Sequence, residues 1–179
     1  MGESPKSAGK KKRLNEGRNE KPSYGIIDSQ SVKTIYASES RGIDGGKKVK
    51  GRKRHIVVDT MGHLLSVIVH AANIHDTKSG IEPALEAYFW YGSIEAFCGD
   101  EGYRGTFVDD VYEYMGLRVD ISERIMPKFT IIPKRWIVER TFAWMGHSRR
   151  LSKDYEITTD SAETMVRISH IHTLLRKCC

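Results

Sequence analysis

Three acidic residues of this sequence are candidates for joint work on a metal ion. Asp28 and Asp100 each follow a short apolar run, at 24–27 and 94–99, and Glu139 stands among arginines in a later segment. Carboxylate oxygens in a chain with few histidines favour Mg²⁺ or Mn²⁺ over zinc. Two such ions held by shared carboxylates suit in-line phosphoryl transfer, because one activates the attacking oxygen and the other stabilises the leaving oxygen. The same three acids also have a plain structural interpretation, as turn or cap residues and an i,i+4 ion pair between Arg135 and Glu139.

The segment that carries Glu139 has the pattern of a helix that begins near residue 134. Its apolar residues recur at helical spacing, and Pro133 lies just before its start, where proline suits a helix N-terminus. The apolar positions are Ile137, Val138, Phe142 and Met145. One face of this helix should therefore be buried against a sheet.

The remaining elements predict a mixed α/β sheet flanked by helices. The expected order is a strand, a β-hairpin, a helix, a strand, a helix, a strand and two helices. We expect Asp76 or Thr77 to cap the first of these helices, and Gly116 to end the second. The strands are expected at 24–28, with 29–33 as a candidate continuation, and at 55–59, 64–71, 94–100 and 117–121, and the helices at 77–91, 107–115, 134–145 and 161–176. Asp28 and Asp100 then stand at the carboxyl ends of strands, where sheets present functional side chains.

Composition indicates one globular domain preceded by a basic arm. The chain has 179 residues, 39% of them apolar, with a formal charge of +6 and a pI of about 9.2. Residues 1–22 are expected to be a disordered basic arm, with the domain spanning 23–179. Three cysteines give neither a disulfide framework nor a zinc spacing. The absence of a signal sequence or a long apolar run predicts a cytoplasmic protein without a membrane segment.

A dense basic stretch at 41–54 is the main candidate for contact with a polyanion. It holds seven cations and one acid, Asp44. Such a patch would release counterions on binding a phosphate backbone, although a solvated hairpin edge protected by charge is the alternative. Together with the arginines near Glu139, the predicted DNA-binding residues are Lys47, Lys48, Lys50, Arg52, Lys53, Arg54, Arg140, Arg149 and Arg150.

Six motifs, in order, resemble those of bacterial insertion-sequence transposases. They are IDSQSVKT at 27–34, GGKKVKGRKRHIVVDT at 45–60, ANIHD at 72–76, DEGYRG at 100–105, RWIVERTFAW at 135–144 and RRLSKDYE at 149–156. The resemblance covers nearly all of residues 25–176. It implies a ribonuclease-H-like fold and DDE chemistry, in which Asp28, Asp100 and Glu139 bind two Mg²⁺ or Mn²⁺ ions. Arg135 matches the arginine of the family's signature, where a guanidinium holds a phosphate bidentately or orients the catalytic acid.

The resemblance also implies a reaction and its partners. Water hydrolyses a phosphodiester at the transposon end, and the freed 3′-OH then attacks target DNA in a transesterification. We expect the chain to act as a homo-oligomer on DNA in the bacterial nucleoid. An inactive DNA-binding remnant and a metal-dependent nuclease of the same fold are the two rival functions.

Two features depart from the family's pattern. Ile132 stands where the signature usually has tyrosine, so a hydroxyl role there is absent or is supplied elsewhere. Related transposases carry an N-terminal helical DNA-binding domain, in place of which this chain has a basic arm. We therefore expect either a truncated copy or the second frame of a frameshifted element, whose upstream frame supplies a DNA-binding domain.

Overall fold

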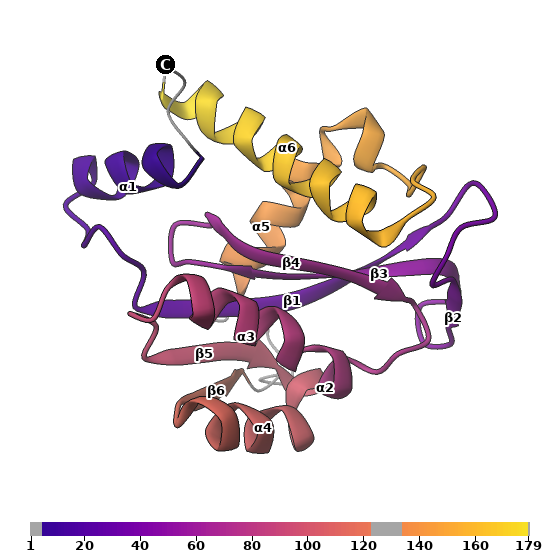
Figure 1. The fold of residues 1–179 in the computed structure, drawn as a ribbon, viewed down its shortest axis with the longest axis horizontal. Coiled ribbons are helices and arrows are strands. Elements are labelled where there is room, and N and C mark those ends of the chain that lie inside the picture. The colour runs from indigo at the N-terminus through magenta and orange to yellow at the C-terminus, as the bar shows by residue number, and fades with distance from the viewer. Residues whose placement is uncertain (1–4, 123–133, 179) are drawn as a thin grey trace, which may run out of the picture.

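A computed structural model describes residues 5–122 and 134–178 of the chain. Its sheet has six strands, and helices lie on both faces (Figure 1). The strands are β1 (Tyr24–Lys33), β2 (Gly42–Asp44), β3 (Val49–Val58), β4 (Leu64–Ala71), β5 (Ala96–Asp100) and β6 (Arg118–Ser122). The helices are α1 (Pro5–Asn15), α2 (Asp76–Ser79), α3 (Ile81–Trp90), α4 (Thr106–Met115), α5 (Arg135–Gly146) and α6 (Thr159–Cys178). Two short 3₁₀ helices, η1 (Glu101–Tyr103) and η2 (Arg149–Leu151), follow β5 and α5.

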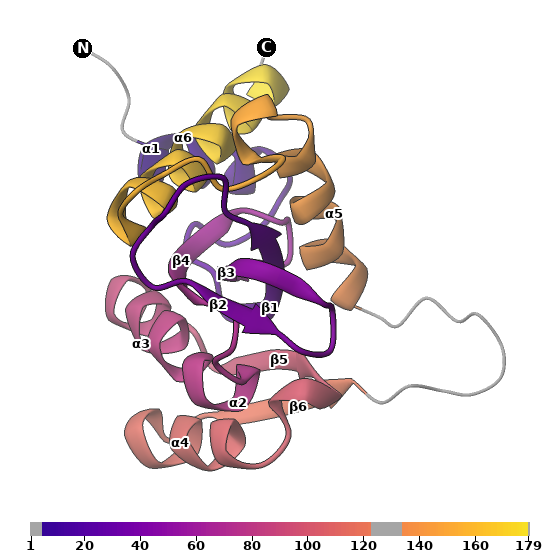
Figure 2. The same ribbon diagram turned by 90° about the vertical axis from the view of Figure 1, so that its right-hand side faces the viewer.

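The sheet is mixed, as the sequence predicts. β1 runs antiparallel to β3, and β3 runs antiparallel to both β2 and β4. On its other side β1 pairs in parallel with β5, which pairs in parallel with β6. The two segments that carry Asp28 and Asp100 are therefore neighbours at the centre of the sheet, and α5 runs beside β1 (Figure 2).

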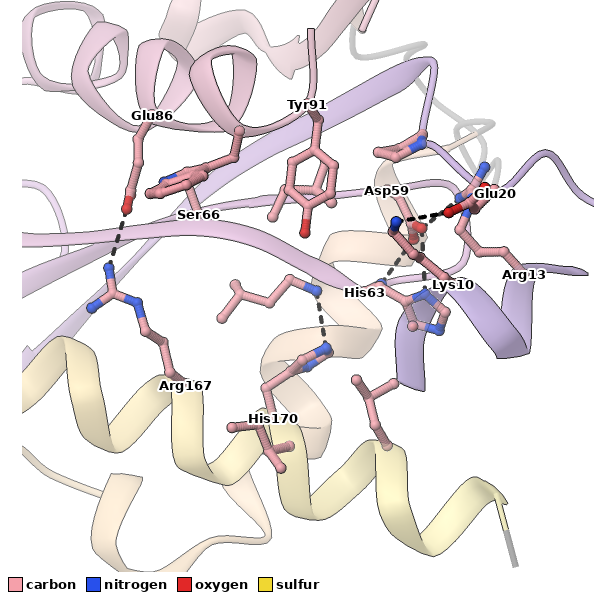
Figure 3. A pocket seen from close by; sticks show the side chains of 17 residues that line it. Lys10, Arg13, Glu20, Asp59, His63, Ser66, Glu86, Tyr91, Arg167 and His170 are labelled. Atoms are coloured by element: carbon pink, nitrogen blue, oxygen red, sulfur yellow. Dashed lines mark hydrogen bonds and ion pairs between the residues drawn. The ribbon is translucent and has the colours of Figure 1, made fainter. Parts of the chain in front are cut away.

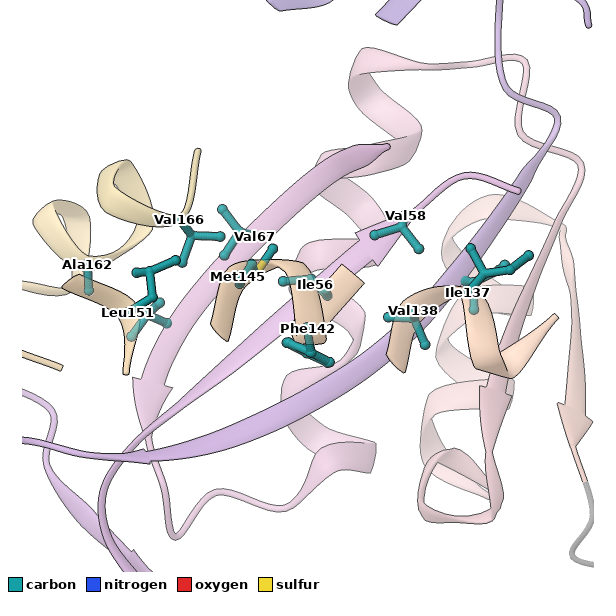
Figure 4. Packing of buried hydrophobic residues seen from close by; sticks show 12 residues of the cluster. Ile56, Val58, Val67, Ile137, Val138, Phe142, Met145, Leu151, Ala162 and Val166 are labelled. Atoms are coloured by element: carbon teal, nitrogen blue, oxygen red, sulfur yellow. The ribbon is translucent and has the colours of Figure 1, made fainter. Parts of the chain in front are cut away.

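Two apolar layers hold the sheet between its helices. On one face α5 and α6 pack through Val138, Phe142 and Val166 against Ile56, Val58 and Val67 of the central strands (Figure 4). On the other face α3 and α4 cover Ile27, Val57 and Phe97. Successive strand residues point to opposite faces, which is why Ile26 and Ile27 belong to different layers. This burial on both faces fixes the position of α5, and with it Glu139, relative to β1 and β5.

The N-terminal segment differs from the expected disordered arm. Residues 5–15 form α1, and the Arg13 side chain is buried with its Nη1 2.5 Å from Asp59 Oδ2. Arg13 Nε also donates to the Asn19 carbonyl. A helix with almost no apolar residues gives no periodic signal, and sequence spacing does not reveal its tertiary ion pair with Asp59. Residues 1–4 of the predicted arm lie outside the described part of the chain.

The predicted cap at Asp76 also differs. His75 is the N-cap of α2, and its Nδ1 accepts from the Thr77 backbone N–H at 3.3 Å. Gly116 does end α4, in the left-handed conformation that favours glycine. Within the described residues, we find no helix with the length and apolar content that crossing a membrane requires.

Candidate active site

Asp28 and Asp100 come from neighbouring parallel strands. β1 and β5 pair in register up to Ile26 opposite Cys98, and each strand reaches its aspartate two residues later. β1 then continues to Lys33 against β3 alone. Asp28 therefore lies in mid-strand, where β1 parts from β5, and not at the strand end that the sequence suggests. Asp100 does end β5, and its Oδ1 accepts from the Gly102 backbone N–H at 2.9 Å.

The electrostatic environment of Asp28 reflects this proximity. Burial raises the pKa of its carboxyl to about 6, and the negative charge of Asp100 adds to the rise. A hydrogen bond from the Ser29 backbone N–H at 2.7 Å and the positive charges of Arg135 and Lys47 lower the pKa by less. Burial, more than the charge of Asp100, is therefore what raises the pKa of the Asp28 carboxyl.

Arg135 links the third predicted acid to this pair. Arg135 Nη2 lies 3.5 Å from Asp100 Oδ2, and Arg135 Nε lies 3.1 Å from Glu139 Oε1. Both residues stand in the first turns of α5, whose buried Ile137 and Val138 pack on the sheet. The structure therefore brings Asp28, Asp100, Arg135 and Glu139 into one region, with the guanidinium between Asp100 and Glu139.

A metal site built from all three acids is not preformed. In the part of the chain that the structure describes, no three or more His, Cys, Asp or Glu side chains are arranged to hold a metal ion. The two aspartates nevertheless suit a divalent cation, because their carboxylates offer hard oxygen ligands from two neighbouring strands. Glu139 pairs instead with Arg135, whose Nε lies 3.1 Å from Glu139 Oε1.

Three of the predicted DNA-binding cations are structural instead. Arg52 is 0% exposed and its guanidinium donates to the carbonyls of residues 39, 156, 157 and 158 and to the Asp154 carboxylate. Arg54 is 2% exposed and donates to the carbonyls of Leu151 and Lys153. Lys53 is 5% exposed and binds Asp76. These side chains fasten the segment after α5 and the start of α2 to β3, so the prediction that they contact DNA is corrected.

The other predicted cations keep access to solvent. Lys47, Lys48 and Lys50 lie exposed on the β2–β3 hairpin, and Lys47 Nζ reaches the Ser29 carbonyl at 3.4 Å. Arg149 and Arg150 are exposed, with Arg150 paired to Glu156 at 2.9 Å. Arg140 is half-buried between the rings of Trp136 and Trp144, at 4.4 Å and 4.6 Å from their centroids, and donates to the Met61 carbonyl.

A cavity of about 390 Å³ lies away from the predicted site, between α1, α3, α6 and the β3–β4 turn (Figure 3). Its lining includes none of the predicted site residues. Its charged groups pair with one another, as Arg13 does with Asp59, Lys10 with Glu20 and Arg167 with Glu86. This cavity is therefore separate from the candidate active site.

Comparisons with known proteins agree with this architecture. A model of the family described as "Transposase DDE domain" matches residues 19–174. A protein of Burkholderia cepacia predicted to be the transposase of insertion sequence element IS402 is 29% identical over 119 residues, which is 62% of this chain. The match covers 56% of that relative, so the chain corresponds to about half of its length.

Solved structures show the fold. A chain of the simian T-cell lymphotropic virus intasome, in complex with the PP2A regulatory subunit B56 gamma, superposes with a TM-score of 0.52 at 13% identity. That match covers 83% of this chain and 47% of the viral chain. The catalytic core domain of BIV integrase gives a TM-score of 0.49 at 10% identity, over 83% of this chain and 81% of that domain. The fold is ribonuclease-H-like, as the motifs implied. Since the family model spans nearly the whole described domain, the chain belongs to the transposase DDE domain family.

Proposed function

We propose that this chain is the catalytic domain of a DNA transposase, which cuts transposon ends and joins them to target DNA. The observation that carries the proposal is the arrangement around Arg135, which lies 3.5 Å from Asp100 and 3.1 Å from Glu139 while Asp28 follows on the adjoining strand. Asp100 and Glu139 both contact this guanidinium, and Lys47 of the β2–β3 hairpin reaches the carbonyl of Ser29, the residue after Asp28. This combination suits chemistry on a phosphodiester.

The reaction has two steps at one site. In the first, water attacks the phosphorus at the transposon end, the P–O3′ bond breaks, and a 3′-OH and a 5′-phosphate are released. In the second, that 3′-OH attacks a target phosphorus, forms a new P–O3′ ester and displaces the target strand's own 3′-OH. Bound divalent ions would lower the pKa of the attacking hydroxyl and stabilise the leaving oxygen. Asp28, Asp100 and Glu139 would hold two Mg²⁺ or Mn²⁺ ions.

The protein residues contribute position and charge. Asp28 and Asp100 are fixed by hydrogen bonds from Ser29 N–H and Gly102 N–H, so their carboxylates are oriented before substrate arrives. Arg135 is placed to exchange its carboxylate partners for a phosphate oxygen when DNA binds, which would free Glu139. The exposed Lys47, Lys48, Lys50, Arg149 and Arg150, with Arg140, would contact the DNA backbone.

A strand-transfer assay tests the proposal against its two rivals. The wild-type chain is incubated with pre-nicked transposon-end DNA and a supercoiled target in Mn²⁺, and joined products are quantified. We expect joined products with the wild type and none with Asp100→Asn. Hydrolysed DNA without joined products would show a nuclease, and DNA binding without either product would show an inactive remnant. Since the chain corresponds to about half of its relative's length, the assay is repeated with the upstream-frame DNA-binding domain that the resemblance predicts, where the element encodes one.

A further inference from the structure

The Asp76 carboxylate contacts three side chains from two strands, Ser29 of β1 and both Lys53 and His55 of β3. Its Oδ1 accepts a hydrogen bond from Lys53 Nζ at 2.9 Å and one from Ser29 Oγ at 3.0 Å. The same oxygen lies 3.3 Å from His55 Nε2. Because His75 caps α2, the Asp76 side chain is not needed to start that helix.

The two β3 partners of Asp76 are deeply buried, and one of them, Lys53, needs a negative charge nearby. His55 is 0% exposed and Lys53 is 5% exposed, and Lys53 also donates to the Ile74 carbonyl. Burial alone would raise the pKa of Asp76, but the neighbouring His55 imidazole and the hydrogen bond from Lys53 hold that pKa well below its usual range. Asp76 is therefore ionised at neutral pH and is the counter-charge for a buried lysine.

Ser29 connects Asp76 to the first catalytic aspartate. The Ser29 hydroxyl donates to Asp76, and the Ser29 backbone N–H donates to Asp28 Oδ1 at 2.7 Å. The Ser29 carbonyl accepts from Lys47 Nζ. The Ser29 hydroxyl thus holds the Ser29 backbone in place. A shift of that backbone would move the N–H that orients the Asp28 carboxylate.

The turn at Gly102 connects Asp76 to the second aspartate. Gly102 N–H donates to Asp100 Oδ1, and a Cβ added to Gly102 would lie 2.9 Å from that oxygen and 3.8 Å from Asp76 Oδ2. The next residue, Tyr103, is 1% exposed, and its pKa is raised by burial and then by the charges of Asp28, Asp76 and Asp100. The turn thus packs closely between the two carboxylates of Asp76 and Asp100.

We propose that Asp76 is a positioning residue that acts through Ser29 and the Gly102 turn to fix the placement of Asp28 relative to Asp100. The inference rests on the proposed function, because the two aspartates matter as a pair only if they hold a metal ion. Asp76 itself touches neither substrate nor the reacting atoms. Its loss should loosen the geometry of the pair while the fold persists.

The test uses two variants that break the network, Asp76→Asn and Ser29→Ala. Two variants serve as controls: Ser29→Thr, which keeps the hydroxyl, and Asp154→Asn. Asp154 is a matched control because it is also buried, binds Arg52 at 3.3 Å and accepts from the Glu156 backbone N–H. It bridges to Thr34, which follows the last residue of β1 and lies six residues beyond Asp28, about 20 Å of extended chain. Two quantities are measured for each chain: the Mn²⁺ dissociation constant by calorimetry, and the ratio of strand-transfer rates in Mg²⁺ and Mn²⁺. Melting temperatures confirm that each variant is folded at the assay temperature.

We expect Asp76→Asn and Ser29→Ala to weaken Mn²⁺ binding about tenfold and to lower the Mg²⁺/Mn²⁺ rate ratio about tenfold, because Mg²⁺ demands near-ideal ligand geometry. Ser29→Thr and Asp154→Asn should leave both quantities within about twofold of wild type, although Asp154→Asn melts at a lower temperature.

Unchanged Mn²⁺ affinity in folded Asp76→Asn would overturn the inference, as would an equal loss in Asp154→Asn. A wild-type chain that binds Mn²⁺ but joins no DNA would remove the proposed function, and the affinities would still decide the role of Asp76. A wild type that binds no Mn²⁺ would overturn both.

Discussion

Arg135 and Glu139 form an ion pair across one turn of α5, with Nε 3.1 Å from Oε1. The same guanidinium reaches Asp100, so it lies between two of the acids that the family resemblance assigns to metal binding. We predict that Arg135→Gln lowers the strand-transfer rate at least tenfold, equivalent to about 1.4 kcal/mol of barrier. The physical reason is the loss of a forked donor for phosphate and for Glu139, which Arg135→Lys should restore only in part.

Metal affinity provides the control for this prediction. Arg135 offers no ligand oxygen, so calorimetry should find that Arg135→Gln binds Mn²⁺ at least as tightly as wild type. A variant that keeps its rate but binds Mn²⁺ tenfold more weakly would show that Arg135 has a different role.

Asp28 should make the stability of the metal-free chain depend on pH. Its folded pKa of about 6 is raised above the ordinary value of 3.8, chiefly by burial. The folded state therefore holds this proton more tightly than the unfolded state, and the resulting stabilisation is present below about pH 4 and lost as the pH rises through 6. We predict that Asp28→Asn in EDTA raises the free energy of unfolding at pH 7.5 by on the order of 2 kcal/mol and changes it little at pH 4. Urea titrations at the two pH values measure this, and an equal effect at both would contradict it.

Arg52 should matter for folding and not for DNA affinity. It is fully buried and pairs with the equally buried Asp154 at 3.3 Å. Removing one partner of such a pair leaves an uncompensated buried charge, so Arg52→Ala should lower the free energy of unfolding by about 3–5 kcal/mol. A double-mutant cycle with Asp154→Ala should show a coupling energy of at least about 1 kcal/mol. A stable Arg52→Ala chain with weakened DNA binding would instead restore the original sequence-based prediction.

The exposed lysines of the β2–β3 hairpin should matter for DNA affinity and not for folding. Replacing both Lys48 and Lys50 with Gln should leave the melting temperature within about 2 °C, since neither side chain is buried. Non-specific DNA affinity should fall, and the slope of log K against log salt concentration should decrease by about 2, because each lysine that neutralises a phosphate accounts for roughly one unit of slope. Fluorescence anisotropy at several salt concentrations measures the slope, and an unchanged slope would remove these lysines from the DNA interface.

The sequence predicted the elements whose signal is local. Apolar spacing placed α5, and Gly116 marked the end of α4. The single helix expected at 77–91 is instead two, because α2 ends and α3 begins at Gly80. The hairpin of β3 and β4 followed from two β-branched runs joined by a short turn. Helix α1 and the three-residue β2 were missed, because neither has an apolar period of its own.

At the site, the sequence-based predictions failed where contacts between distant segments decide which side chains are buried. Charge density in residues 41–54 predicted a single basic patch. The elements packed on both faces of β3 bury Arg52, Lys53 and Arg54, whereas Lys47, Lys48 and Lys50 lie exposed near the hairpin turn. Sequence spacing also could not show that Asp76 binds Ser29 and Lys53, since these contacts join residues from three separate segments. The buried partners of a charged residue are set by tertiary packing, which composition does not encode.

Metal-directed cleavage of the protein backbone tests most directly whether Asp28, Asp100 and Glu139 act as one metal-binding unit. Fe²⁺ replaces Mg²⁺ in the chain bound to pre-nicked DNA, and peroxide with ascorbate generates hydroxyl radicals at the bound ion. We predict three groups of cuts, close to residues 28, 100 and 139, which excess Mg²⁺ suppresses and Asp100→Asn abolishes. Cuts near 28 and 100 with none near 139, or cuts that persist in Asp100→Asn, would contradict the assignment of these three acids to a shared metal site.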